Sequence, residues 1–249
     1  MGHKKVEIYK MKDKNESYHK RKGLLFDLPM KIGICGRSQL SGKSNLLGNL
    51  LLSEDSRLYK NDFLGDNIYI FSPSAHTDYK IKTIIEEKDI PPQNVFTEMT
   101  DGVLEALYEM IETEFKERAA KKEPQEHRLI IADDMSADGS LKKHKNGTLA
   151  KIVQNGRHVL ISTIATCQKY SDLPTFLKEN LTGGCFFSGT DRQLEAISDD
   201  HNYLEDKTAF RKMFRKVTND PHTFLVVNYS NPLSARYMDT NFVPIMHDC

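Results

Sequence analysis

Apolar residues along this chain fall into short continuous runs that are separated by segments with helical periodicity. The continuous runs predict strands at residues 30–35, 67–71, 128–135, 159–167 and 185–188, with a further short strand at 94–96. Runs that are apolar throughout, rather than at alternate positions, are typical of a parallel sheet that is buried on both faces. The intervening segments predict helices at residues 43–52, 79–88, 101–120, 148–154, 173–180, 191–197 and 205–217.

The helix predicted at 101–120 has the clearest pattern, because Leu104, Leu107 and Ile111 recur at helical spacing and Asp101 in its first turn suits the helix dipole. The last segment, residues 222–242, predicts a terminal strand pair joined through Asn231 and Pro232. Strands that alternate with helices indicate a three-layer α/β fold with a mainly parallel sheet. We expect a single domain over residues 23–249.

The composition agrees with this fold class. The chain has 249 residues, enough for one well-buried core, and 39% hydrophobic with 28% charged residues is the balance of an ordinary globular protein. No window reaches the ~18 consecutive apolar residues of a membrane span, so we expect no membrane segment. The 35 basic and 35 acidic side chains cancel, so any contact with nucleic acid must come from local patches.

Residues 1–22 form a separate basic arm, in which eight lysine or arginine side chains face three acidic ones. Such an arm either keeps the chain soluble or binds phosphate groups. The four cysteines are too widely spaced for a zinc knuckle or a CxxC pair. Cys35, Cys167 and Cys185 lie in apolar runs, so we expect buried, reduced thiols and a reducing compartment.

The stretch GICGRSQLSGKSNLL, which begins at Gly33, resembles a phosphate-binding loop between a strand and a helix. It has five residues between Gly36 and Gly42, one more than the usual loop. Small residues let successive backbone N–H groups wrap an anion at a helix N-terminus. The expected nucleotide-binding residues are Gly36, Ser41, Gly42, Lys43, Ser44 and Asn45. Lys43 would reach the terminal phosphates and Ser44 would hold magnesium; the alternative is an ordinary helix start that bears a lysine.

The stretch RLIIADD places two acids at the end of the third long strand. Asp133 would hold magnesium beside the phosphate-binding loop, and Asp134 would act as general base towards the attacking water. Paired acids after four apolar residues are costly to bury without a cation. A solvated turn is the alternative, but the two motifs together indicate a P-loop NTPase that binds its nucleotide with Mg²⁺.

Two polar residues flank the run VLISTIATCQ. Gln168 ends the strand that we place next to the strand of Asp133, where it either senses the γ-phosphate or caps a turn. Arg157 precedes this strand and is either a surface residue at a helix end or an arginine that acts on the nucleotide of a neighbouring subunit.

Two basic groups are candidates for DNA contact. Residues 136–148 follow the paired acids directly and carry Lys142, Lys143 and Lys145, which either grip a phosphate backbone or belong to a solvated linker. The second group has helical spacing and forms one basic face, which meets either DNA or water: Arg211, Lys212, Arg215 and Lys216.

The order GRSQLSGKS, LIIADDM and NGRHVLISTIATCQ resembles the DNA-packaging ATPases of large eukaryotic DNA viruses and virophages. That group includes the poxvirus packaging ATPase and belongs to the FtsK–HerA superfamily of P-loop motors. The resemblance covers roughly residues 28–190. The loop departs from the group in having Gln39 and Leu40 in place of small residues, and the second acid is Asp134 rather than glutamate.

The resemblance implies a RecA-like core in a homo-oligomeric ring, a pentamer or hexamer, that pumps double-stranded DNA into a capsid at its portal vertex. It implies action in the host cytoplasm, at the viral assembly site or in the virion. It also assigns Lys43, Asp134, Gln168 and Arg157 to catalysis. The alternatives are a small-molecule P-loop kinase, a regulatory GTPase or a nucleotide-binding protein that is not a motor. No guanine-recognition motif supports the GTPase.

Overall fold

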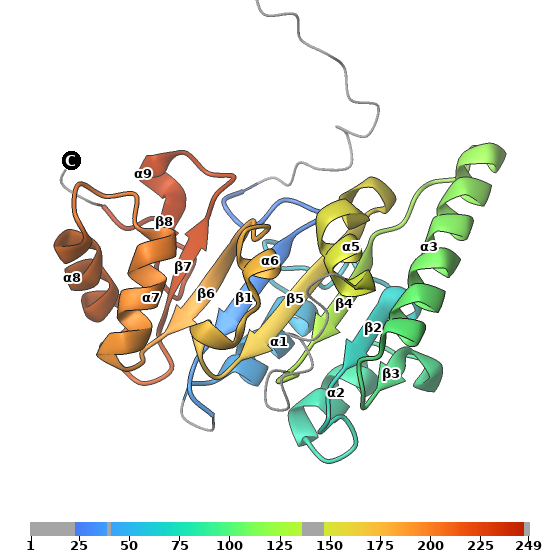
Figure 1. Ribbon diagram of the computed structural model, residues 1–249, viewed down its shortest axis with the longest axis horizontal. Coiled ribbons are helices and arrows are strands. Elements are labelled where there is room, and N and C mark those ends of the chain that lie inside the picture. Colours follow the sequence, from blue (N-terminus) through green and yellow to red (C-terminus); the bar gives the residue numbers. More distant parts are fainter. Residues whose placement is uncertain (1–22, 39–40, 136–146, 247–249) are drawn as a thin grey trace, which may run out of the picture.

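The computed structural model describes residues 23–38, 41–135 and 147–246. Eight strands within these residues form one sheet in the order β3-β2-β4-β5-β1-β6-β7-β8 (Figure 1). The strands are β1 Lys31–Cys35, β2 Ile68–Phe71, β3 Val95–Phe96, β4 Arg128–Ala132, β5 Ile161–Cys167, β6 Gly183–Phe187, β7 Phe224–Asn228 and β8 Tyr237–Met238. The first six run parallel, whereas β7 and β8 pair antiparallel. The predicted parallel sheet with a terminal strand pair is therefore confirmed.

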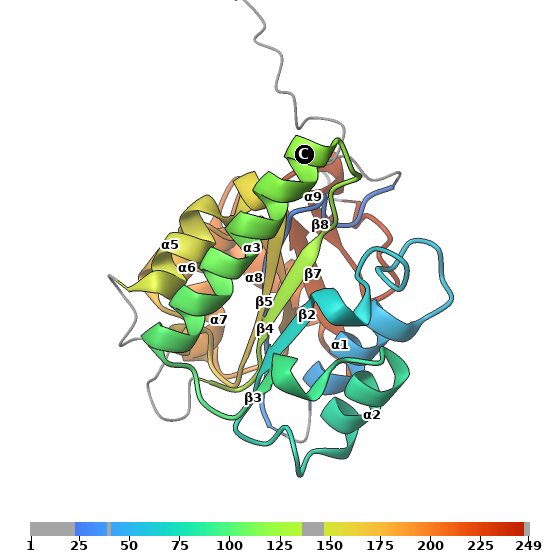
Figure 2. The same cartoon turned by 90° about the vertical axis from the view of Figure 1, so that its right-hand side faces the viewer.

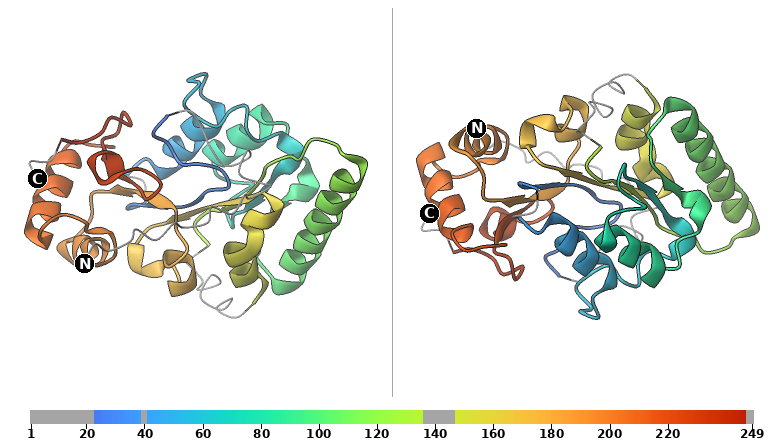
Figure 3. Two further views of the ribbon diagram at one scale, coloured as in Figure 1. Left: turned by 90° about the horizontal axis from the view of Figure 1, so that it is seen from above. Right: turned by 90° about the horizontal axis from the view of Figure 1, so that it is seen from below.

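Helices cover both faces of the sheet, as the views along its edges show (Figures 2 and 3). One face carries α1 Lys43–Leu52 and α2 Tyr79–Glu87; the other carries α3 Asp101–Lys121, α5 Thr148–Asn155, α6 Thr175–Lys178, α7 Asp191–His201 and α8 Lys207–Val217. A short helix, α9 Leu233–Arg236, joins β7 to β8. Single 3-10 turns occur at Gly65–Asn67, Pro92–Asn94, Gly156–Val159 and Tyr170–Asp172. The predicted three-layer architecture is thus confirmed.

Two hydrophobic cores result because side chains alternate between the faces of each strand. In β4, Leu129 and Ile131 pack in the core beneath α1 and α2, whereas Ile130 and Ala132 pack in the core beneath α3 and α5. All of these side chains are buried, which explains why the strand is apolar throughout. The sheet is consequently held on both sides, and its strand ends are rigidly placed.

Three predicted boundaries were wrong for reasons of backbone conformation. The strand predicted at 128–135 ends at Ala132, because Asp134 has a left-handed backbone (φ 51°) that cannot continue a strand. The strand predicted at 159–167 begins at Ile161, because Leu160 has φ 59° after a 3-10 turn. The helix predicted at 173–180 is confined to Thr175–Lys178, since Pro174 occupies its N-cap.

Two groups of residues with predicted roles lie outside the described residues. These are the basic arm at 1–22 and the lysines Lys142, Lys143 and Lys145.

Candidate functional site

The parallel strands bring three candidate motifs to one edge of the sheet. The phosphate-binding loop follows β1, the paired acids follow β4, and Gln168 follows β5. β5 lies between β1 and β4, with Cys35 opposite Cys167 and Ala132 opposite Ala165. Because all three strands run in the same direction, their carboxyl ends meet at this edge, where ligands bind in open α/β sheets.

Close packing explains the glycines of the loop. A Cβ atom on Gly36 would lie 2.7 Å from Ser41 Cβ and 2.8 Å from Phe187 Cβ, so only glycine fits there. Gly42 caps α1 in the left-handed region at φ 94°, which a side chain disfavours. The Ser41 hydroxyl donates to the carbonyl oxygen of Arg37 at 2.7 Å. These contacts hold Gly36, Ser41 and Gly42 close together before the helix.

Lys43 is the first residue of α1 and its side chain is buried. Its Nζ donates to the carbonyl oxygen of Gly36 at 2.8 Å, so the ammonium folds back over the loop rather than pointing to solvent. Ser44 and Asn45 follow in the first turn of the helix, half-buried and exposed respectively. Free N–H groups at a helix N-terminus together with an ammonium group favour an anionic ligand here.

Asp133 is a buried carboxylate held by two hydroxyl groups. Ser72, just after β2, donates to Oδ2 at 2.9 Å, and Thr166, near the end of β5, donates to Oδ1 at 2.7 Å. Burial raises the pKa of Asp133, and the nearby charges of Asp134 and Asp78 raise it further, against the two hydroxyl hydrogen bonds. No ion pair to Asp133 occurs among residues 23–38, 41–135 and 147–246.

Asp134 adopts its left-handed conformation next to the same hydroxyl group. Its backbone N–H donates to Thr166 Oγ1 at 3.0 Å, and Gln168 Nε2 donates to its Oδ2 at 2.9 Å. Its other carboxylate oxygen, Oδ1, is buried and has no hydrogen-bond partner among the residues that the structure describes. A non-glycine residue with positive φ is uncommon and concentrates at functional sites. The structure therefore brings Asp133, Asp134 and Gln168 together in one network.

Ser72 and Thr166 were not singled out from the sequence. Both stand at strand ends, Ser72 after the run NIYIF and Thr166 inside VLISTIATCQ, but either residue could have been an ordinary buried hydroxyl. Only the pairing of β2 and β5 on either side of β4 places them against Asp133.

These donors suit a magnesium ion. Asp133 and Ser44 offer the oxygen ligands that Mg²⁺ prefers, and a buried carboxylate with a raised pKa lacks the counter-charge that such an ion would supply. The unpartnered Oδ1 of Asp134 has the same need. The residues present therefore fit the ion that the sequence implied.

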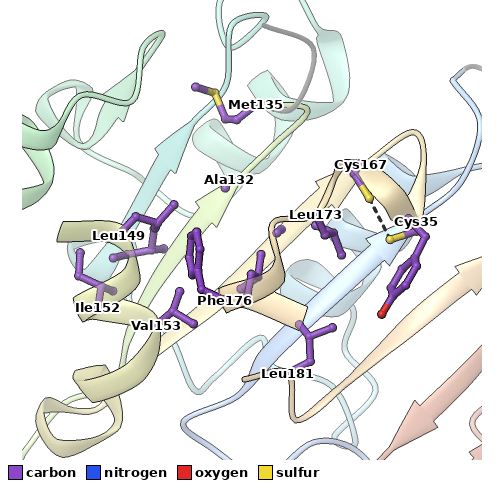
Figure 4. Close-up of a cluster of buried hydrophobic side chains, with 14 of the residues drawn as sticks. Cys35, Ala132, Met135, Leu149, Ile152, Val153, Cys167, Leu173, Phe176 and Leu181 are labelled. Carbon is purple, nitrogen blue, oxygen red and sulfur yellow. Dashed lines mark hydrogen bonds between the residues drawn. The ribbon is translucent and has the colours of Figure 1, made fainter. Parts of the chain in front are cut away.

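Two cysteines lie side by side at the ends of the neighbouring strands β1 and β5 (Figure 4), and Cys35 directly precedes Gly36 of the loop. The Sγ atoms of Cys35 and Cys167 are hydrogen-bonded at 2.9 Å across β1 and β5. Burial raises the pKa of Cys167, and Cys35 beside it adds to the shift, so the thiol stays protonated. Cys35, Cys167 and Cys185 are all free and buried, as expected of thiols that pack like small hydrophobic groups.

Arg157 lies at the opposite edge of the sheet, before β5 begins. It is exposed and lines a cavity of about 500 Å³ together with Lys31, the first residue of β1. Burial lowers the pKa of Lys31, and the charge of Arg157 lowers it further. Arg157 therefore lies away from the nucleotide site of its own subunit, and both predicted alternatives stay open: an ordinary surface arginine, or an arginine that acts on a neighbouring subunit.

The basic face of α8 is partly neutralised within the chain. Arg211 pairs with Glu195 at 2.8 Å and Arg215 pairs with Asp191 at 2.7 Å, both acids belonging to α7. Exposed pairs of this kind contribute at most about 1 kcal/mol, so they mainly orient the two helices. Two of the four basic side chains thus meet acidic partners rather than open solvent.

A phosphate-binding loop after β1, paired acids after β4 with β5 between these strands, and a mainly parallel sheet define a P-loop NTPase fold. Residues 16–232 match the model of the family described as Poxvirus A32 protein, and the chain belongs to this family. This confirms the resemblance seen in the sequence. A search of curated proteins found no match. Within the described residues, no helix is long and apolar enough to cross a membrane.

Solved structures with the same fold include viral and bacterial ATPases. The genome packaging NTPase B204 from Sulfolobus turreted icosahedral virus 2, in complex with AMP, is 16% identical with a TM-score of 0.57. That match covers 88% of this chain and 99% of B204, and the complex of B204 with ATP-gammaS gives a TM-score of 0.55. EssC (ATPases 2 and 3) from Geobacillus thermodenitrificans is 15% identical, with a TM-score of 0.55 over 80% of this chain and 38% of EssC. These likenesses describe the fold.

Proposed function

We propose that this protein is an ATP-driven motor that moves double-stranded DNA into a viral capsid. The observation that supports this proposal is the network of Asp133, Asp134 and Gln168. The network lies at the edge of the sheet where the phosphate-binding loop leaves β1. Membership of the Poxvirus A32 protein family and the fold shared with the genome packaging NTPase B204 support the same function.

The network suggests how this chain would hydrolyse ATP. Lys43 would bind the terminal phosphates, while Asp133 and Ser44 would hold the magnesium ion, which neutralises phosphate charge when bound. Asp134 would accept a proton from water as the water oxygen bonds to the γ-phosphorus and the bond to ADP breaks. Gln168 orients Asp134 through its amide hydrogen bond. If the amide instead donated to an oxygen of the γ-phosphate, the position of Gln168 at the end of β5 would depend on which nucleotide is bound.

The contact with DNA rests on charge alone. The chain has no net charge, so the basic arm at 1–22 and the lysines Lys142, Lys143 and Lys145 are the segments that we propose contact the phosphate backbone. The segment 136–148, which contains these lysines, comes soon after Asp134 in the sequence. A change at Asp134 during hydrolysis would therefore be passed to the residues that contact DNA. We place the motor in a homo-oligomeric ring of five or six subunits at the capsid portal vertex, in the host cytoplasm during assembly.

The decisive experiment measures ATP turnover with and without double-stranded DNA at several salt concentrations. A motor should be stimulated by DNA, and the stimulation should weaken as salt rises because phosphate contacts release counterions. Turnover that ignores DNA, or transfer of phosphate to a nucleoside, would instead support a small-molecule kinase. Lys43→Ala should abolish turnover in either case.

The role of Asp134 is tested by Asp134→Asn. The variant should bind ATP yet hydrolyse it at least about 100-fold more slowly, since an amide cannot accept the proton. Asp89→Asn is the matched control, because Asp89 has the same φ of 51° and lies far along the chain in the loop after α2. Equal turnover by Asp134→Asn and the wild type would exclude the proposed base.

A further inference from the structure

A cavity of about 340 Å³ lies beside the phosphate-binding loop and is not used by the hydrolytic network. Ser41 and Asn45 form its border with the loop and α1. One wall continues along α1 to Leu50 and on to Leu58 after the helix. The facing wall comes from the end of β6 and the segments next to β7 and β8, with Phe187, Phe224 and Phe242. These last two strands carry no motif that the sequence analysis could assign.

The sheet order fixes the direction in which a nucleotide must lie. The paired acids follow β4, and the order β4-β5-β1-β6-β7 puts them on one side of the loop and the cavity on the other. A nucleotide whose terminal phosphate faces Asp133 and Asp134 must therefore project its base over β6 and β7. We propose that this cavity binds the purine base of the nucleoside triphosphate, an inference that rests on the proposed nucleotide site.

The cavity presents a row of aromatic rings for such a base. The ring centroids of Phe187 and Phe224 are 5.0 Å apart, and those of Phe224 and Phe242 are 6.2 Å apart. Phe187 is 4% exposed and Phe224 is 5% exposed, so these two rings are held in place by the core, whereas Phe242 is half-buried. The rings are tilted against one another, by 52° and 57°, so the half-buried Phe242 at the end of the row is the ring whose face a purine can contact.

His222 connects this cavity to the phosphate-binding loop. It has φ 65°, and its Nδ1 would lie 3.5 Å from a Cβ atom on Gly42. The exposed His222 ring and the Asn45 side chain therefore stand where the sugar or the polar edge of a base would emerge. Because an aromatic row recognises a ring face rather than a hydrogen-bond pattern, ATP and GTP should bind with similar affinity.

The test compares ATP with magnesium tripolyphosphate, which has the phosphate chain but no base. Calorimetric titration should show that the wild type binds ATP more tightly than tripolyphosphate. Phe242→Ala should weaken ATP binding about tenfold, as expected for loss of one stacking ring, and leave tripolyphosphate binding unchanged. Phe115→Ala is the matched control, a half-buried phenylalanine on α3, and should change neither affinity.

If the alanine variant folds poorly, Phe242→Leu can replace it, because leucine keeps the apolar packing. This variant should also weaken the binding of ATP and leave the binding of tripolyphosphate unchanged. Equal affinity of the wild type for the two ligands, or an equal loss for both in the Phe242 variants, would overturn the base-binding cavity while leaving the phosphate site intact. Failure of the wild type to bind either ligand would overturn the proposed function itself.

Discussion

Asp133 is a residue whose burial is unfavourable for stability but suits the role that we assign to it. It is a carboxylate with 5% exposure, and the two hydroxyls that hold it only partly replace the water it has lost. Asp134 beside it adds like charge and carries an unfavourable backbone conformation. Both features are unfavourable for folding, which is typical of groups placed for chemistry rather than for stability.

The raised pKa of Asp133 predicts a specific pH dependence of stability. A carboxyl group with a raised pKa in the folded state stabilises the fold less once it ionises, so its contribution is lost as pH rises from the ordinary value of 3.8 through the raised folded value. In magnesium-free protein, the midpoint temperature of thermal unfolding should therefore fall as pH rises through this range. The Asp133→Asn variant should not show this fall. A wild type and a variant with parallel curves would contradict the burial argument.

At the scale of elements, one buried ion pair ties α3 to the start of β4. The side chain of Arg128 is 1% exposed, and its guanidinium donates to Glu114 at 2.7 Å and to the carbonyl oxygen of Glu126 at 3.1 Å. Glu114 itself is half-exposed, so the pair sits at the boundary of the core. The register of β4, and with it the position of Asp133, depends on this end of the strand being held.

Removing Glu114 should therefore destabilise the protein through the charge it leaves behind. We expect Glu114→Ala to lower the free energy of unfolding by about 2 kcal/mol, because the buried guanidinium loses its carboxylate. Glu105→Ala, an exposed glutamate on the same helix, should change stability by less than about 0.5 kcal/mol. Chemical denaturation of both variants measures the difference; similar values would show that the pair contributes nothing specific.

At the scale of the whole molecule, the two edges of the sheet hold different functional candidates. The carboxyl edge holds the loop and the acids, whereas Arg157 and the buried Lys31 line a cavity at the amino edge. Burial and the charge of Arg157 lower the pKa of Lys31, and an anionic partner from outside the subunit would relieve the repulsion between these two cations. A ring in which one subunit presents its amino edge to the nucleotide of the next would use this arrangement.

Mixed rings test that arrangement. Arg157→Ala and Asp134→Asn subunits should each be inactive alone, but a mixture should regain part of the ATP turnover, because some interfaces then combine an intact acid with an intact arginine. The measurement is turnover across a series of mixing ratios, with mixed assembly verified by differently tagged subunits. Verified mixed rings without recovery would remove Arg157 from the proposed mechanism.

The sequence by itself determined most of the strands and helices, and it predicted the residues to which we assign chemistry. Continuous apolar runs specify a sheet buried on both faces, and the helix 43–52 was predicted at its observed bounds, because such patterns are local. The sequence did not single out Ser72 and Thr166, and it predicted that the third strand ends at Met135, three residues after the observed end at Ala132. Those features depend on which strands become neighbours and on backbone conformations that neighbours impose. The tertiary structure alone decided that two hydroxyl groups hold Asp133 and that Arg157 lies at the far edge of the sheet. It also decided that aromatic rings from distant segments lie beside the loop. Each of these placements brings together residues that are far apart in the chain, which local sequence patterns do not specify.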